Sequence, residues 1–89
     1  MKLSQVLSDE KLLSIVMINI TNHNDNSYSY SLWKLEQNKL YLFNDEYKVD
    51  NILFLDWDIE MIEPNTFYIV TNQNFKLKID LYFSGAILE

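Results

Sequence analysis

The chain has 89 residues, of which 48% are hydrophobic and 15% aromatic, with a net charge of −6 and no cysteine. This length suits one domain, residues 1–89, and the aromatic content excludes a disordered chain, because such side chains bury enough surface to offset the loss of chain entropy. Because cysteine is missing, the chain can form neither a disulfide framework nor a thiolate metal site. Its net charge is negative and it has no arginine, which disfavours direct binding to nucleic acid.

The apolar residues near the N-terminus do not predict a membrane segment. The longest run, residues 12–20, is interrupted by Ser14 and Asn19 and is shorter than the roughly 20 residues that a membrane span requires. Asp9 and Glu10 precede this run, whereas the segment before the apolar core of a signal peptide is positively charged. Together with the absence of cysteine, these features predict a cytoplasmic protein with no membrane association.

The first part of the chain predicts a helix followed by a strand. Leu3, Val6 and Leu7 stand at helical spacing in residues 2–8, which predicts a short N-terminal helix that covers one face of a sheet. Residues 14–21 are rich in isoleucine and valine and have apolar residues on both faces, as an interior strand does. A polar loop follows, because its Asn and Asp side chains bond to their own backbone.

The middle of the chain predicts two strands and one ambiguous segment. Residues 27–36 alternate as a half-buried strand, and the buried face changes near Trp33, as a bulge would cause. Residues 39–43 predict the next strand of a meander. Residues 47–55 fit either a helical turn or a strand, and the pattern leaves both alternatives open.

Three strands are predicted in the last third of the chain. Residues 56–63 alternate acidic and apolar side chains, and a turn at Pro64 leads into a strand over residues 67–71. Residues 75–83 alternate for nine positions, which predicts the long central strand of the sheet. The predicted fold class is α+β, with a short N-terminal helix packed on a single antiparallel β-meander sheet of about five to six strands.

Residues for catalysis or metal binding are scarce in this sequence. The single histidine, His23, stands in an Asn-rich loop, and the single glycine, Gly85, cannot form a phosphate-binding loop. Asp56, Asp58 and Glu60 have the spacing that opens a calcium loop, but the glycine that such a loop needs for its turn is missing. We therefore expect no enzyme activity, no metal site and no cofactor.

Negative charge is concentrated in residues 45–63. This segment holds seven acidic residues against one lysine, so it accounts for the whole net charge of −6. One interpretation is an anionic stripe that binds a basic surface of a partner protein; the alternative is a solvated outer strand whose charges prevent edge pairing. The candidate partner-binding residues are Asp45, Glu46, Asp50, Asp56, Asp58, Glu60 and Glu63.

Two segments of the sequence resemble small acidic proteins encoded by phages of low-GC Gram-positive bacteria. These segments are the opening residues 1–7 and residues 55–65 with the apolar Phe67-Tyr68-Ile69-Val70 that follows. Small acidic phage proteins include inhibitors of host defence, of the anti-CRISPR or DNA-mimic kind. The resemblance implies a phage or mobile-element inhibitor in the host bacterial cytoplasm. Such an inhibitor binds a basic, nucleic-acid-binding site on a host defence or DNA-processing protein.

Two other functions stay open at this stage. One is a structural or accessory phage protein that self-associates through sheet edges, through its tyrosine side chains or through the apolar residues 85–88. The other is an immunity protein that neutralises a toxin. Whether the chain is a monomer or a homodimer is also left open by the sequence.

Overall fold

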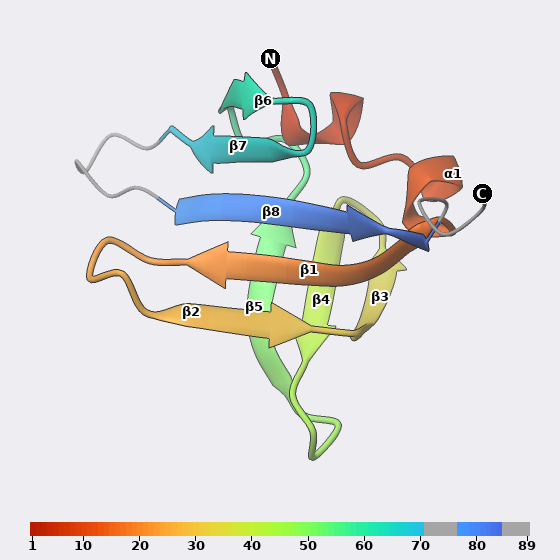
Figure 1. Ribbon diagram of the computed structural model, residues 1–89. Coiled ribbons are helices and arrows are strands. Elements are labelled where there is room, and N and C mark those ends of the chain that lie inside the picture. The colour runs from red at the N-terminus through yellow and green to blue at the C-terminus, as the bar shows by residue number, and fades with distance from the viewer. Residues whose placement is uncertain (71–76, 85–89) are drawn as a thin grey trace.

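Two antiparallel sheets form this protein, in a computed structural model that describes residues 1–70 and 77–84 (Figure 1). One sheet has five strands in the order β2-β1-β8-β7-β6, and the other has three in the order β3-β4-β5. In Figure 1 the three-stranded sheet lies behind the five-stranded sheet, and its strands cross those in front. The prediction of a single sheet is therefore wrong, and the fold is mainly β.

The chain forms these elements in order. Within the described residues, a 3-10 helix, η1, precedes one short α-helix, and eight strands follow. Their bounds are η1 Leu3–Gln5, α1 Asp9–Leu12, β1 Ile15–Thr21, β2 Ser27–Tyr30, β3 Leu32–Glu36, β4 Lys39–Phe43, β5 Val49–Phe54, β6 Ile59–Glu63, β7 Thr66–Ile69 and β8 Leu77–Phe83.

The predicted N-terminal helix is wrong in extent but right in what it buries. Within residues 1–14 only η1 and the single turn α1 are helical. The backbone N–H groups of Leu3 and Ser4, which have no partner within η1, donate to the carbonyls of Trp57 and Leu55 and hold η1 against the β5–β6 connection. Ser8 then caps the start of α1. Leu3 is nevertheless fully buried, and Val6 and Leu7 are buried beside it. None of the helices in the described ranges is long and apolar enough to cross a membrane.

The predicted strand over residues 27–36 is divided between the two sheets. β2 ends at Tyr30 in the five-stranded sheet, and β3 begins at Leu32 in the three-stranded sheet. The chain turns this corner at Ser31, which explains why the buried face changes near Trp33. The pairing of β3 with β4 runs without a register shift, so the bulge expected there is not the cause.

The remaining predictions concern the second half of the chain. The strand alternative for residues 47–55 is confirmed by β5, whereas the strand predicted over residues 56–63 begins only at Ile59. β8 lies between β1 and β7, so the prediction of a central strand is confirmed for residues 77–83. Residues 71, 75 and 76 and the apolar residues 85–88 lie outside the described residues.

The hydrophobic core lies between the inner faces of the two sheets. Every strand contributes to it, although the β3 residues Trp33 and Leu35 are only partly buried against it, and residues before α1 and in the β5–β6 connection complete it. Among the described residues no polar or charged side chain is buried. The buried residues are Leu3, Val6, Leu7, Ile15, Ile18, Ile20, Tyr30, Leu40, Leu42, Leu53, Leu55, Ile59, Phe67, Ile69, Ile79 and Leu81.

Candidate functional site

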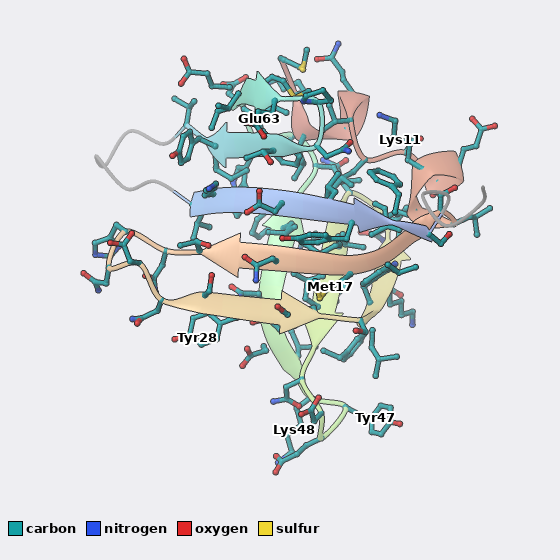
Figure 2. The ribbon with its side chains drawn as sticks, viewed as in Figure 1. Lys11, Met17, Tyr28, Tyr47, Lys48 and Glu63 are labelled. Carbon is teal, nitrogen blue, oxygen red and sulfur yellow. The ribbon has the colours of Figure 1, made fainter. Side chains whose placement is uncertain are left out.

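The outer face of the five-stranded sheet is polar, and it faces the viewer in Figure 2. Cross-strand register places its side chains in two rows that each run over all five strands. Within each strand the alternate residues point inward to the core, so the residues of these two rows point outward, and they are polar. The next outward pair of β1 and β8, Met17 and Tyr82, is not part of these rows. We call this surface the outer polar face. Its first row is Glu60, Tyr68, Lys78, Thr21 and Ser27, and its second row is Glu63, Thr66, Asp80, Asn19 and Ser29.

Hydrogen bonds between neighbouring strands fix short side chains on the outer polar face. Asn19 donates through Nδ2 to the Ser29 hydroxyl at 2.9 Å, and the hydroxyls of Thr21 and Ser27 lie 2.8 Å apart. Across the other half of the sheet, the Thr66 hydroxyl donates to Asp80 Oδ1 at 2.7 Å. These side chains have few rotatable bonds and are already held in place, so binding a partner would cost them little conformational entropy.

A β-bulge in β6 decides where the acidic side chains of this strand point. Met61 pairs with Phe67 and Glu63 pairs with the next residue, Thr66, so Ile62 is the extra residue between two regular pairs. Without the bulge, two residues three positions apart would point to opposite faces of the sheet. Because of it, Glu60 and Glu63 both lie on the outer polar face, in the same rows as Lys78 and Asp80.

The other predicted acidic residues lie elsewhere. Asp45 and Glu46 belong to the turn between β4 and β5, whereas Asp56 and Asp58 belong to the connection between β5 and β6. Asp58 pairs with Lys2, whose Nζ lies 3.1 Å from its Oδ1. The expectation that the acidic residues at positions 56, 58 and 60 line one face of one strand is therefore wrong, because the backbone turns before Ile59.

The acidic segment is thus divided between two ends of the molecule. In Figure 2 Glu63 lies at one end, and Tyr47 and Lys48 of the β4–β5 turn lie at the opposite end. β5 has six residues and separates the two groups by roughly 20 Å at about 3.4 Å per residue. The seven predicted binding residues cannot all contact one small patch of a partner.

Asp50 has a structural contact that sequence patterns did not reveal. The Tyr30 hydroxyl donates to Asp50 Oδ2 at 2.5 Å and accepts from Asn51 Nδ2 at 2.8 Å, which joins β2 of one sheet to β5 of the other. Burial of the phenol, followed by its hydrogen bond to Asp50, raises the pKa of Tyr30 from 10.0 to about 12. Asp50 is therefore better explained as a contact between the sheets than as a binding residue.

No family model matches this chain, and no curated protein or solved structure matches it either. Its chemistry must therefore be argued from its own surface.

Within residues 1–70 and 77–84, no group of three or more histidine or acidic side chains could hold a metal ion. The carboxylates at positions 56, 58 and 60 accordingly do not converge. His23 is exposed in the loop between β1 and β2, far along the chain from the acids of β6.

A cavity of about 580 Å³ lies between α1 and β3. It is mostly apolar, and its lining residues are Asp9, Glu10, Leu12, Leu13, Trp33 and Leu35. These side chains include no nucleophile beside a base, so the cavity presents no arrangement typical of catalysis.

Of the two rows of the outer polar face, the sequence-based prediction of a binding site included only Glu60 and Glu63. Asp80 and Thr66 belong to the same row as Glu63, and Asn19 continues this row across β1. The alternation of residues 75–83 already placed Asp80 away from the core. What the sequence did not reveal is that β6 and β8 share one sheet with only β7 between them.

Proposed function

We propose that this chain is a non-enzymatic binding protein that binds a basic surface of a partner protein through its outer polar face. One observation carries the proposal. The bulge at Ile62 brings Glu60 and Glu63 onto the same face as Asp80, and no strand or helix of the described residues covers that face (Figure 2).

The charge of the chain supports a basic partner. Its net charge is −6, and Glu60 and Glu63 are both exposed at the β6 edge of the sheet. An acidic surface of this kind speeds the encounter with a basic one and disfavours other acidic proteins, so its main effect is on association rate and specificity. The serine, threonine and asparagine side chains beside the acids supply hydrogen bonds once contact is made.

The class of partner follows from this chemistry. Strongly basic protein surfaces are commonly the sites that bind nucleic acid. We propose that the chain is a phage or mobile-element inhibitor that occupies such a site on a host defence or DNA-processing protein, in the manner of a DNA mimic. The resemblance of residues 55–65 to small acidic phage proteins agrees with this proposal, as does the absence of arginine.

A matched pair of variants tests the proposal. The double variant Glu60→Gln with Glu63→Gln removes two charges from the outer polar face. The control, Asp45→Asn with Glu46→Gln, removes two charges from the opposite end of the molecule. Tagged forms of both and of the unchanged chain are used to capture proteins from a bacterial lysate, and bound proteins are identified by mass spectrometry.

We expect the unchanged chain and the control to capture the same basic, nucleic-acid-binding protein, and the Glu60→Gln, Glu63→Gln variant to lose it. The affinity for the purified partner should fall as salt is raised, because the charges that attract it are exposed. Equal capture by all three forms, or binding that does not change with salt, would contradict the proposal.

A further inference from the structure

The outer face of the three-stranded sheet differs from the outer polar face because it is mostly apolar. Pairing of β3, β4 and β5 places nine outward side chains in three cross-strand rows. We call this surface the outer apolar face. Its rows are Leu32, Phe43 and Val49; Lys34, Tyr41 and Ile52; and Glu36, Lys39 and Phe54.

A bulge in β5 sets the composition of this face. Leu42 pairs with Asn51 and Phe43 pairs with Val49, so Asp50 is the extra residue in β5. The bulge lets Asp50 reach the Tyr30 hydroxyl, and it brings Val49 outward beside Phe43. Apolar side chains therefore occupy the whole first row of the outer apolar face.

These side chains lie outside the core between the sheets. Leu32 is 43% exposed and Val49 is 49% exposed, whereas Leu40, Leu42 and Leu53 on the inner side of the same sheet are fully buried. The four remaining apolar side chains, Tyr41, Phe43, Ile52 and Phe54, are half-buried and are absent from the core cluster. A contiguous apolar sheet surface of this kind is typical of an interface rather than of solvent exposure.

We infer that the outer apolar face binds the same face of a second copy of this chain. The argument for a second copy is the charge on the face. Lys34, Lys39 and Glu36 lie there together, so the face carries both signs, and each sign can meet its opposite on a second copy across a two-fold axis. Lys34 and Glu36 are 4.0 Å apart and well exposed, so this weak pair can exchange for pairs with the other copy.

The charge on the rest of the chain agrees with this arrangement. The three charged side chains of the face sum to +1, so the other residues carry −7. Two copies that meet through this face keep most of their acidic residues away from the contact. A strongly basic or strongly acidic partner would bind this face weakly, because its charges would be attracted by some of the charged side chains on the face and repelled by the others.

The size of the face sets the expected strength of association. Nine outward residues are fewer than half of the roughly 20 to 30 residues that each side of a standard interface contributes. We therefore expect a weak, reversible dimer, because the face is smaller than the interfaces of stable complexes.

Two valine variants with matched exposure test the inference. Val49→Glu places a charge in the apolar row, where Val49 is 49% exposed; Val16→Glu makes the same change on β1, where Val16 is 50% exposed. Sedimentation velocity over a range of concentrations measures association, and circular dichroism shows that each variant is folded. Dilution of the labelled chain, followed by amide NMR, identifies the residues in the contact.

We expect the unchanged chain and Val16→Glu to dimerise equally, and Val49→Glu to dimerise about tenfold more weakly or not at all. The amides that shift on dilution should belong to β3, β4 and β5. A monomer at several hundred micromolar would overturn the inference and leave this face for a different protein. Shifts at the edge strand β2, or equal weakening by Val16→Glu, would overturn it as well. Neither result bears on the Glu60 and Glu63 test of the proposed function.

Discussion

The two sheets are alike on their inner faces and opposite on their outer faces. Both bury aliphatic and aromatic residues against each other, as Phe67 and Leu53 illustrate. Outside, the five-stranded sheet has hydrogen-bonded polar side chains and the three-stranded sheet has aromatic and aliphatic ones. The alternation of residues along a strand therefore identifies the side chains that pack in the core. The side chains on the opposite face are not fixed by core packing, so they can differ between the two sheets.

Bulges also help to set both outer faces. Ile62 is the extra residue in β6 and Asp50 is the extra residue in β5. The first brings Glu63 to the outer polar face, and the second brings Val49 to the outer apolar face. Bulges therefore determine which side chains each face offers to a partner.

The largest expected effect is on stability, and it should be equal for the two sheets. Phe67→Ala and Leu53→Ala each remove a fully buried side chain, so each should lower the free energy of unfolding by about 2 to 5 kcal/mol through lost burial and a residual cavity. Denaturant unfolding measures both. A cost below about 0.5 kcal/mol for either residue, the range typical of surface changes, would show that its sheet does not share the core.

The contact between the sheets should have the next largest effect. Tyr30→Phe removes the hydroxyl that bonds to Asp50 and Asn51 and should cost about 1 to 3 kcal/mol. The raised pKa adds a pH dependence. The phenol of Tyr30 stays neutral up to about pH 12 in the folded state but only up to about pH 10 in the unfolded state. The stability that the neutral phenol adds to the folded state is therefore complete below about pH 10 and is lost as the pH rises toward about 12.

Urea unfolding of both forms across that pH range isolates this contribution. The difference in stability between the unchanged chain and Tyr30→Phe should shrink as the pH rises from 10 to 12. A difference that stays constant through this range would show that Tyr30 ionises equally in the folded and unfolded states.

A smaller effect is expected from the hydrogen bonds of the outer polar face. Thr66→Val keeps the shape of the side chain but removes the bond to Asp80, which should cost about 0.5 to 1.5 kcal/mol. Ser29→Ala, on the exposed edge strand β2, serves as the comparison and should cost about 0.5 kcal/mol or less. Thermal unfolding measures the loss of stability in each variant. A larger loss for Ser29→Ala than for Thr66→Val would show that the Asn19–Ser29 bond stabilises the fold more than the Thr66–Asp80 bond does.

The smallest expected effect concerns metal. The acidic residues at positions 56, 58 and 60 stand in a connection and at the start of β6 rather than around one point, so millimolar calcium should leave the melting temperature unchanged. EDTA should likewise have no effect. A calcium-dependent rise of several degrees would indicate a site that stabilises the folded state, because a ligand bound only to that state must do so.

Local pattern predicted much of the fold but not its division into two sheets. The alternation over residues 75–83 correctly identified the central strand, since Ile79 and Leu81 are buried. The spacing of Leu3 and Leu7 correctly marked buried residues, but the segment is held by hydrogen bonds from the backbone of Leu3 and Ser4 to the β5–β6 connection. That pairing links segments about fifty residues apart, and local spacing contains no information about it.

The candidate binding surface was predicted only in part for the same reason. Glu60 and Glu63 were identified by the concentration of charge in residues 45–63, although that segment proved to span both ends of the molecule. Asp50 was included, yet its carboxylate bonds to Tyr30. Asp80 was not considered, because only the sheet order brings β8 within two strands of β6.

We propose that the outer polar face is the binding surface for a basic partner. Amide NMR of the isotope-labelled chain, titrated with the captured partner, tests it most directly. We predict the largest shifts at Asn19, Thr66 and Asp80, which share one row with Glu63. Shifts confined to β3, β4 and β5, or to the turn that holds Asp45 and Glu46, would contradict it.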